Sequence, residues 1–281
     1  MRIGNNPNRI ANVEGFEKIV FCVVTHLPRL TGYHEHRLEV VQTCLETMRS
    51  GAHMRHTFMV WDNGSCPELL DWLANDFRPD TLIMTPNIGK TAARTSMIRM
   101  LPPETVVCYS DDDMLYYDRW LAPQLELLQH FPNVACVTGY PVRTSFRWGN
   151  ENTLAWARKF AKVEKGRFLP REWEDDFSVS IGRDPARHAE TSANDYEHIA
   201  TYNGRRAYLT SHHCQFIGYQ ERLAGAAFYD GRAMGDEKIT DIALDKIGLR
   251  LATTDRLARH IGNVLHDELR RETQTKLMPQ A

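Results

Sequence analysis

The chain has 281 residues, of which 42% are hydrophobic and 25% are charged, and these proportions exclude a long disordered chain and fit one large globular domain. The 34 basic and 36 acidic side chains leave a formal net charge of −2, which excludes an overall basic surface for nucleic acid or an anionic membrane. No stretch reaches the roughly 18 apolar residues of a membrane span, and the N-terminus lacks a signal-peptide core. We therefore expect a cytoplasmic protein, with peripheral membrane contact left open.

The first 140 residues alternate between short apolar runs and amphipathic stretches. Residues 1–17 are polar and predict a loose N-terminal lead-in, and Lys18 to Thr25 is a β-branched run typical of a strand covered on both faces. Short connections between the later segments predict right-handed βαβ crossovers and a mainly parallel sheet flanked by helices. We expect helices over 36–50 (stopped by Gly51), 66–75, 91–101 and 123–130, and further strands over 57–61, 81–84, from 106 and over 134–138.

The strand that starts at Val106 ends in three consecutive carboxylates, Asp111, Asp112 and Asp113. Ligands bind at the carboxyl edge of open α/β sheets, and alternation along a strand predicts Asp111 and Asp113 on one side with Asp112 on the other. Neighbouring carboxylates repel unless a cation lies between them, so the run favours Mg²⁺ or Mn²⁺, which would attract phosphate oxygens. A polar turn at the end of a strand is the alternative.

Residues 141–206 change in character, with twelve basic and ten acidic side chains, several aromatics and weak periodicity. They predict an inserted lobe at the sheet edge, whose aromatic residues either stack on a sugar or base or, as we favour, form the lobe's own core. Strand-like pieces follow over 207–218. We then expect a helix over 236–247 with Ile239, Ile242, Ala243 and Ile247 on its apolar face, a strand over 249–252, and a frayed or accessory tail over 264–281.

The six cysteines show no CxxC spacing and no grouping with histidine, which argues against a zinc site. Cys22, Cys108 and Cys136 lie within apolar strand-like runs. We expect them to be small buried residues in a reducing compartment.

Two polar segments follow predicted strands at the same sheet edge as the three aspartates. Asp62 begins an Asp-Asn-Gly-Ser segment and can accept hydrogen bonds from a nucleobase, although a plain Asn-Gly turn explains it as well. Asn87 and Gly89 open a helix whose early turns carry Lys90 and Arg94, a combination that suits a diphosphate. Its spacing matches neither the Rossmann glycine fingerprint nor a P-loop, and a solvated basic helix face is the alternative.

The later candidates are acids at a helix start and isolated histidines. Asp236 and Glu237 follow Gly235, where the helix dipole favours acids in any case, and either can act as a general base toward a hydroxyl group. His260 and His266 are lone histidines that can complete a metal shell.

The order of these segments resembles that of the family-two glycosyltransferases, which have the GT-A fold (the nucleotide-diphospho-sugar transferase fold). The resemblance covers about residues 18–140, the nucleotide-sugar-binding part, and 207–263, the acceptor and catalytic-base part of the same domain. It leaves 141–206 unmatched. The segments that carry it are the Thr25 loop, Asp62-Asn63-Gly64-Ser65, Asn87-Ile88-Gly89 with Arg94, Asp111-Asp112-Asp113, Gly235-Asp236-Glu237 and His260-Ile261-Gly262.

The resemblance implies transfer of a sugar from a nucleoside-diphosphate donor to a hydroxyl group of a glycan, lipid-linked or other acceptor, with inversion and with Mn²⁺ or Mg²⁺. The family's Glu-Asp pair is replaced here by Asp236-Glu237, so position indicates Glu237 as the base and residue type indicates Asp236; we prefer Glu237. By carry-over, the donor-binding residues are Thr25, Asp62, Asn87, Gly89, Arg94, Asp111 and Asp112, with Asp62 at the base, and the metal-binding residues are Asp113, Asp111 and His260.

Three other functions compete with glycosyl transfer as explanations of these residues. A sugar nucleotidyltransferase also uses an acidic metal site, but it needs a glycine-rich basic loop that Thr25 to Arg29 does not supply. A non-catalytic nucleotide-sugar or glycan-binding module is opposed by the intact acids. A DNA-directed glycosyltransferase needs a basic face, and the lobe's excess of two positive charges is too small for one.

Overall fold

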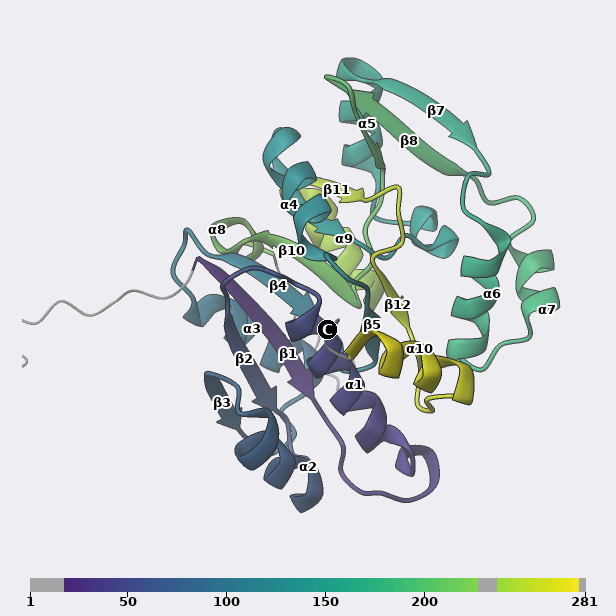
Figure 1. Ribbon diagram of the computed structural model, residues 1–281. Coiled ribbons are helices and arrows are strands. Elements are labelled where there is room, and N and C mark those ends of the chain that lie inside the picture. The colour runs from purple at the N-terminus through teal and green to yellow at the C-terminus, as the bar shows by residue number, and fades with distance from the viewer. Residues whose placement is uncertain (1–17, 227–236, 278–281) are drawn as a thin grey trace, which may run out of the picture.

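The computed structural model describes residues 18–226 and 237–277. One mixed ten-stranded sheet, in the order β3-β2-β1-β4-β10-β6-β11-β9-β8-β7, runs through the molecule, and β12 and β5 form a separate pair (Figure 1). The strands are β1 (Ile19–Thr25), β2 (Thr57–Asp62), β3 (Thr81–Met84), β4 (Val106–Ser110), β5 (Met114–Tyr116), β6 (Val134–Thr138), β7 (Lys162–Gly166), β8 (Glu197–Tyr202), β9 (Arg205–Tyr208), β10 (Gln215–Tyr219), β11 (Leu249–Ala252) and β12 (Ala258–His260).

Helices cover both faces of the sheet, which confirms the predicted α/β class. None of those in the described part of the chain is long and apolar enough to cross a membrane. The α-helices are α1 (Arg37–Ser50), α2 (Pro67–Trp72), α3 (Lys90–Met100), α4 (Leu121–His130), α5 (Glu151–Phe160), α6 (Arg171–Ser180), α7 (Pro185–Thr191), α8 (Gln220–Leu223), α9 (Glu237–Ile247) and α10 (Asp267–Leu277); two 3₁₀ turns, η1 (Gly32–His34) and η3 (Arg143–Arg147), and a π-helical turn, η2 (Leu73–Phe77), complete the set.

The strands β3, β2, β1 and β4 are parallel, as predicted, and their carboxyl ends lie together. Thr25 at the end of β1 is in register with Asp62 of β2, and Val23 is in register with Ser110 of β4. The strand β10 runs antiparallel between β4 and β6, so the full sheet is mixed. The polar segments that follow β1, β2 and β4 are thereby brought to one edge.

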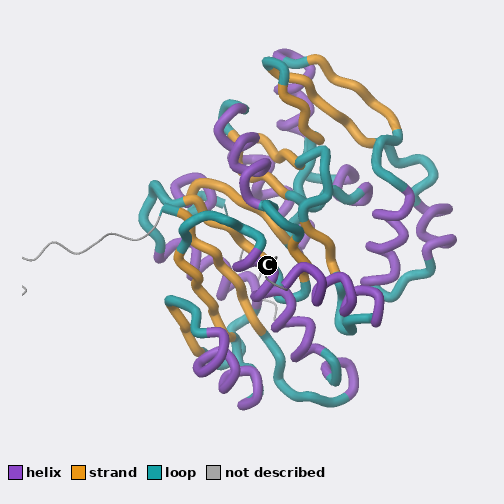
Figure 2. The backbone as a smooth tube through the Cα atoms, in the orientation of Figure 1, coloured by secondary structure: helices purple, strands orange, loops and turns teal. Residues whose placement is uncertain are grey.

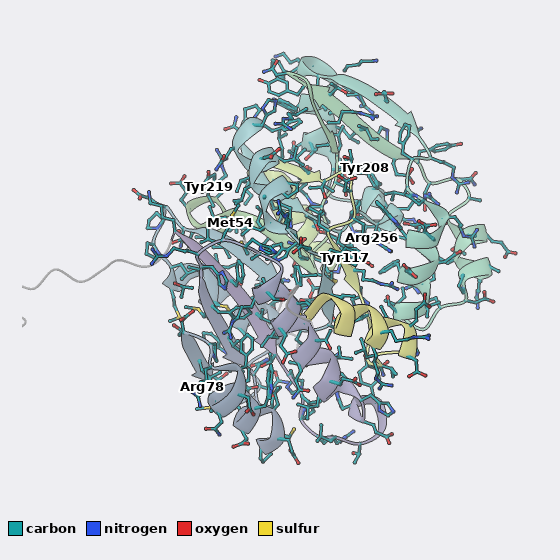
Figure 3. All side chains as sticks on the ribbon, in the orientation of Figure 1. Met54, Arg78, Tyr117, Tyr208, Tyr219 and Arg256 are labelled. Atoms are coloured by element: carbon teal, nitrogen blue, oxygen red, sulfur yellow. The ribbon has the colours of Figure 1, made fainter. Side chains whose placement is uncertain are left out.

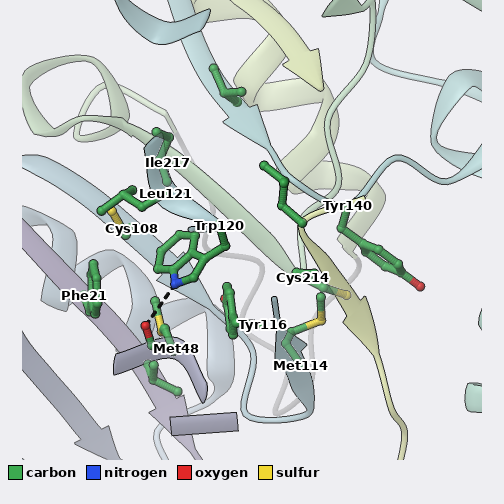
Figure 4. Packing of buried hydrophobic residues seen from close by; sticks show 14 of the residues in the cluster. Phe21, Met48, Cys108, Met114, Tyr116, Trp120, Leu121, Tyr140, Cys214 and Ile217 are labelled. Atoms are coloured by element: carbon green, nitrogen blue, oxygen red, sulfur yellow. Dashed lines mark hydrogen bonds between the residues drawn. The ribbon is translucent and has the colours of Figure 1, made fainter. Parts of the chain in front are cut away.

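Alternate residues of the central strands pack on opposite faces because side chains alternate along a strand. Phe21 and Val23 belong to the larger hydrophobic cluster, with residues of α1, α2 and α4, whereas Val20 and Cys22 belong to a second cluster with α3, α8 and α9. Figure 4 shows the first cluster around Trp120, whose indole Nε1 donates a hydrogen bond of 2.9 Å to the Met48 carbonyl. All six cysteines are free and buried, as expected for Cys22, Cys108 and Cys136.

Gly51 ends α1 as predicted, but for a reason of space. Its φ of −77° is open to any residue. A Cβ atom at this position would lie 2.8 Å from the Tyr117 carbonyl oxygen, closer than carbon and oxygen can pack. Glycine is therefore required by the close approach of another loop.

Residues 141–206 contribute both helices and sheet. The strands β7 and β8 pair antiparallel, β8 pairs with β9, and β9 pairs with β11, so this hairpin continues the main sheet (Figure 2). Asp176 of α6 forms ion pairs with Arg256 at 2.6 Å and with Arg259 at 3.0 Å. Arg256 also lies over the ring of Tyr117, 5.9 Å from its centroid (Figure 3). These contacts tie α6 to the segment that carries β12.

The predicted apolar face of α9 is only partly correct, since Ala243 and Ile247 pack against the second hydrophobic cluster while mainly polar residues are the most deeply buried. Its buried residues are Thr240, Asp241, Leu244 and Asp245, while the four predicted residues are only half-buried. Asp241 is neutralised by buried Arg250, and Asp245 accepts hydrogen bonds from the backbone N–H groups of Asn152 and Thr153 at 2.9 and 3.0 Å. Partners elsewhere in the fold thus allow acids to face inward.

The tail was expected to be frayed or accessory, and the frayed alternative does not hold for 267–277, which form α10. Leu265 and Leu269 are buried against Val40 of α1, and Arg270 donates two hydrogen bonds of 2.7 Å to Glu39. Figure 1 shows α10 alongside α1. The C-terminal segment therefore closes over the helix that follows β1.

Candidate functional site

A cavity of about 380 Å³ opens at the carboxyl ends of β1, β2 and β4, within the size range of small-molecule sites. Six of the predicted site residues line it: Asn87, Asp111, Asp112, Asp113, Glu237 and His260. Its other lining residues are Val24, His26, Tyr33, His34, Arg37, Asn63, Lys90, His213 and Cys214. The lining residues range from Val24 to His260, so residues more than two hundred positions apart in the sequence meet in one cavity.

The three aspartates do not alternate in the predicted way. The strand β4 ends at Ser110, and Asp111 to Asp113 form the turn that leads into β5, so a two-residue period no longer applies. Asp111 accepts hydrogen bonds of 2.8 Å from Lys90 and from the Tyr109 hydroxyl. Asp112 and Asp113 instead share one partner, Arg37.

Arg37, in the first turn of α1, was missed by the sequence analysis. It forms an ion pair with Asp112 and donates a hydrogen bond of 3.3 Å to Asp113 Oδ2. Burial raises the pKa of Asp112 above its usual range, although the Arg37 guanidinium opposes the shift. The only signal was a basic residue at the start of the helix that follows β1, and such residues are common on solvated helix faces.

Asp113 and His260 are brought together by the pairing of β5 with β12, which aligns His260 with Met114. The His260 Nε2 lies 3.4 Å from Asp113 Oδ2, and its Nδ1 hydrogen-bonds Ser180 Oγ at 2.8 Å. Burial alone would raise the pKa of Asp113, but His260 and Arg37 hold it well below its usual range. Burial lowers the pKa of His260, and the Asp113 carboxylate more than restores it, so that it lies above its usual value.

The second oxygen of Asp113 is the feature that fits a metal ion. Asp113 Oδ1 is buried and has no hydrogen-bond partner among the described residues. A buried carboxylate oxygen without a partner is costly, and a hard divalent cation is a suitable ligand for it. The neighbouring imidazole of His260 is a second suitable donor. His266 lines a different cavity.

Glu237, at the first turn of α9, is held between two cations. Its Oε1 lies 2.9 Å from Lys90 Nζ, and its Oε2 lies 3.1 Å from Arg94 Nη1. Burial alone would raise the pKa of Glu237, but Lys90 and Arg94 lower it well below its usual range. Asp236, the other candidate base, lies outside the described residues.

Four predicted donor-binding residues, Thr25, Asp62, Gly89 and Arg94, do not line this cavity. Asp62 accepts hydrogen bonds from the Thr25 hydroxyl at 3.0 Å and from the backbone N–H groups of Gly64 and Ser65 at 3.1 and 3.0 Å. Arg94 is fully buried and also donates to Thr240 Oγ1 at 2.6 Å. These residues support the cavity wall from behind.

Two asparagines shape the loop that enters α3. Asn63 Oδ1 accepts a hydrogen bond of 2.9 Å from Ile88 N, and Asn87 Oδ1 accepts one of 2.9 Å from Gly89 N. Gly89 has a φ of 91°, a conformation that glycine adopts without strain. The predicted Asn87 and Gly89 are thus joined by Asn63, which lies in the Asp62-Asn63-Gly64-Ser65 segment and was not among the predicted donor-binding residues.

The statement that no cysteine groups with histidine is wrong. His212, His213 and Cys214 are consecutive, and their ligand atoms lie within 4.8 Å of one another. Burial and the nearby Asp111 raise the pKa of the Cys214 thiol well above its usual range, which disfavours the thiolate that zinc binds. His212 Nδ1 also accepts a hydrogen bond of 3.3 Å from Cys214 N. Without a metal ion, the protonated thiol and this hydrogen bond are therefore favoured.

Three solved structures illustrate the similarity of the chain to known proteins. A mannosyltransferase from Pyrobaculum calidifontis, solved with GDP-Man and Mn²⁺, is 20% identical with a TM-score of 0.34, and the match covers 43% of this chain and 34% of that one. GalNAc-T7, solved with UDP, GalNAc and Mn²⁺, is 12% identical with a TM-score of 0.49, and the match covers 90% of this chain and 45% of that one. Glucosyl-3-phosphoglycerate synthase from Mycobacterium tuberculosis, solved with Mn²⁺, UDP and glucosyl-3-phosphoglycerate, is 13% identical with a TM-score of 0.45. The match covers 91% of this chain and 76% of that one.

The chain spans about a third of the mannosyltransferase and under half of GalNAc-T7. A search of curated proteins gave no match. The model of the family described as glycosyl transferase family 2 matches residues 32–184, which is more than half of the 281 residues. The chain belongs to glycosyl transferase family 2, as the order of its strand-end motifs predicted, and it has the helix-flanked sheet expected of that family's GT-A fold.

Proposed function

We propose that the chain transfers a glycosyl group, of the hexosyl or a similar type, from a nucleoside-diphosphate sugar to a hydroxyl acceptor, with a divalent metal ion and with inversion. The observation that carries the proposal is Asp113, whose free, buried carboxylate oxygen lies beside His260 in a cavity that also contains Glu237. A cation site and a candidate base thus lie in one cavity of suitable size.

Asp113 and His260 are the residues proposed to hold Mn²⁺ or Mg²⁺. When bound, such an ion supplies positive charge that stabilises the departing diphosphate. Asp111 is a third candidate ligand, but its two oxygens already accept hydrogen bonds from Tyr109 and Lys90. We therefore place Asp111 mainly beside the ribose.

Lys90 is proposed to bind the diphosphate. It faces the cavity between Asp111 and Glu237, and although burial would lower the pKa of Lys90, these two carboxylates raise it well above its usual value. Its charge is therefore permanent at neutral pH. The loop shaped by Asn87 and Gly89, and supported by Asp62 and Thr25, is the proposed base and ribose side of the donor site.

Glu237 is proposed as the general base, with Asp236 as the alternative. Lys90 and Arg94 each engage one Glu237 oxygen and weaken the carboxylate as a base, so we propose that Lys90 turns to the diphosphate when the donor binds and leaves Oε1 to accept the proton of the acceptor hydroxyl. The acceptor oxygen then attacks the anomeric carbon from the face opposite the diphosphate. A single displacement of this kind inverts the anomeric configuration.

A reducing compartment such as the cytoplasm is proposed for the protein. The six free, buried cysteines support it, since small hydrophobic thiols of this kind persist where disulfides do not form.

The test of the function is a donor screen. The purified protein is incubated with a panel of nucleotide sugars and Mn²⁺, with and without a chelator, and release of the nucleoside diphosphate is measured. We expect binding and slow hydrolysis of one donor, both lost with the chelator. If folded protein neither binds nor hydrolyses any donor, the proposal fails, and release of pyrophosphate from a nucleoside triphosphate would favour a nucleotidyltransferase instead.

A further inference from the structure

A second cavity, of about 370 Å³, adjoins the first on the side of residues 141–206. The two cavities share His213, Cys214 and His260 as lining residues. Arg147, Trp148 and Arg183 line the second cavity away from this shared wall. The second cavity therefore adjoins the donor cavity at three shared side chains, while Asp113 and Glu237 line only the first cavity, and an acceptor in the second cavity has to extend past the shared side chains to meet them.

A third cavity, of about 520 Å³, extends the second one, because Arg147 and Arg183 line both. Arg187 of α7 adds a third guanidinium group to it. Among the residues that the structure describes, the only acid that lines it is Asp184, which accepts a hydrogen bond of 2.8 Å from Ala186 N. The lining of this third cavity is therefore strongly cationic.

Two of the three arginines have no acid of their own. Arg147 is paired with Asp195 at 2.6 Å. Arg183 and Arg187, by contrast, make no ion pair with any residue that the structure describes. The acid on the inner side, Asp241, is already neutralised by buried Arg250 and hydrogen-bonded to His213 at 3.1 Å. Positive charge is thus left over where the cavities open.

Trp148 supplies a fixed aromatic ring to the wall of the second cavity, with Lys238 Nζ 5.6 Å from the ring centroid. Its indole Nε1 donates a hydrogen bond of 3.3 Å to Asp241 Oδ2, and its ring is half-buried in the wall of the second cavity. Aromatic rings with a fixed polar end are suited to holding the apolar face of a polyol or sugar. Such a surface would hold an acceptor between the arginines and the shared wall.

We propose that the second and third cavities together form the acceptor subsite. The acceptor carries a phosphate group, which Arg183 and Arg187 bind. The proposal rests on the glycosyl transfer proposed above. Guanidinium groups form paired hydrogen bonds with phosphate oxygens, which favours phosphate over a neutral polyol. The acceptor hydroxyl that extends past the shared wall loses its proton to Glu237, and its oxygen bonds to the anomeric carbon. The bond from that carbon to the diphosphate oxygen breaks, and the nucleoside diphosphate leaves with the electron pair.

The binding test uses matched pairs of acceptor probes, titrated calorimetrically into the protein with Mn²⁺ and a nucleoside diphosphate. We expect glycerol 3-phosphate and glucose 6-phosphate to bind at least about tenfold more tightly than glycerol and glucose, because charged hydrogen bonds to phosphate are worth on the order of that factor. The double variant Arg183→Gln/Arg187→Gln should lose this preference. Arg158→Gln, an exposed arginine of α5 outside these cavities, should keep it.

Further arms identify the source of the phosphate. Glycerate tests a carboxylate in place of the phosphate, and equal binding of glycerate and glycerol 3-phosphate would overturn the assignment to phosphate. Vesicles of phosphatidylglycerol test a lipid-borne phosphate with a net negative charge, and phosphatidylcholine vesicles are the control in which choline neutralises the same phosphate. Binding to the first alone, abolished in the double variant, would assign the subsite to a lipid-linked acceptor.

Donor hydrolysis without acceptor separates this inference from the proposed function. The double variant should hydrolyse the donor at the wild-type rate, since neither arginine lines the donor cavity. If the wild-type protein has no activity but prefers the phosphate probes through these arginines, the function fails and the anion site stands. Equal affinity for phosphorylated and neutral probes, or equal loss in Arg158→Gln, would refute the phosphate subsite.

Discussion

The two halves of the sheet use charged residues in opposite ways. Around β1, β2 and β4, acids and bases gather at strand ends and face an open cavity, with Asp113 Oδ1 left without a partner. In the interior around β8, β9 and β11, by contrast, the buried ions Arg143, Glu197, Asp241 and Arg250 pair with one another. Other buried atoms without partners in the described part of the chain, such as Glu174 Oε2, lie outside the cavity, so what distinguishes Asp113 is a carboxylate oxygen without a partner on a residue that lines it.

Arg250 shows the structural use most clearly. Its guanidinium is fully buried and pairs with Asp241 while also donating to the Trp148 and Ser211 carbonyls and to Asn150 Oδ1. Glu197 behaves similarly, accepting from Arg143 and from the Phe168 and Leu169 N–H groups. These ions hold the lobe to the sheet and leave little capacity for a ligand.

The sharpest test of the catalytic half is Glu237→Gln. Loss of the general base should lower turnover by about 10²- to 10⁴-fold with little change in donor affinity, because the amide keeps the shape of the side chain but cannot take a proton. Steady-state kinetics and donor titration measure the two quantities. Glu221→Gln, an exposed acid in the first turn of α8, is the control. Equal loss of donor affinity and turnover in Glu237→Gln would make this residue a binding group.

The structural half should respond through stability to Arg250→Ala. The substitution leaves the Asp241 carboxylate buried without its main partner, and we expect a loss of about 3–5 kcal/mol in the free energy of unfolding. Urea denaturation followed by tryptophan fluorescence measures it. A loss below about 1 kcal/mol would contradict the view that this network is structural.

The metal prediction rests on Asp113→Asn. Replacing the carboxylate with a neutral amide should weaken Mn²⁺ binding by about 100-fold. Loss of a residue that only supports a metal ligand already lowers metal affinity by about 10- to 100-fold, and Asp113 is proposed to contact the ion directly. Titration of Mn²⁺ in the presence of a nucleoside diphosphate is the measurement. Asp118→Asn, whose side chain is exposed beside His53, should bind Mn²⁺ like the wild type. Unchanged affinity in Asp113→Asn would remove this residue from the metal site.

The smallest effect is expected from Arg205→Ala on β9. Arg205 pairs with Glu126 at 3.1 Å, but both side chains are more than half exposed. Exposed pairs contribute less than about 1 kcal/mol, so stability should barely change. The same urea experiment provides a matched comparison with Arg250→Ala. A cost close to that of Arg250→Ala would mean that burial does not separate the two kinds of ion pair.

Much of the fold could be predicted from sequence because β1, β2, β4 and β6 are largely apolar runs with clear boundaries. The strands β7 and β8 escaped notice, since their charged residues, including the buried Glu197, break up any apolar pattern. The polar buried face of α9 could not be foreseen either, because its partners, Arg250 and the start of α5, are fixed only by the fold. In the site, motif order located the aspartates and Glu237, whereas Arg37 belongs to no motif.

The hydrogen-bonded pairing of β12 with β5 has a bearing on which ions can bind. Ile261 N donates to the Asp113 carbonyl at 2.9 Å, so the main chain on either side of the two proposed ligands is already locked together. The β5–β12 pairing fixes the separation of the Asp113 and His260 backbones, so the distance between the two proposed ligands cannot readily adjust to a bound cation. Ionic radius, more than binding strength in free solution, should then decide which metal the proposed site accepts.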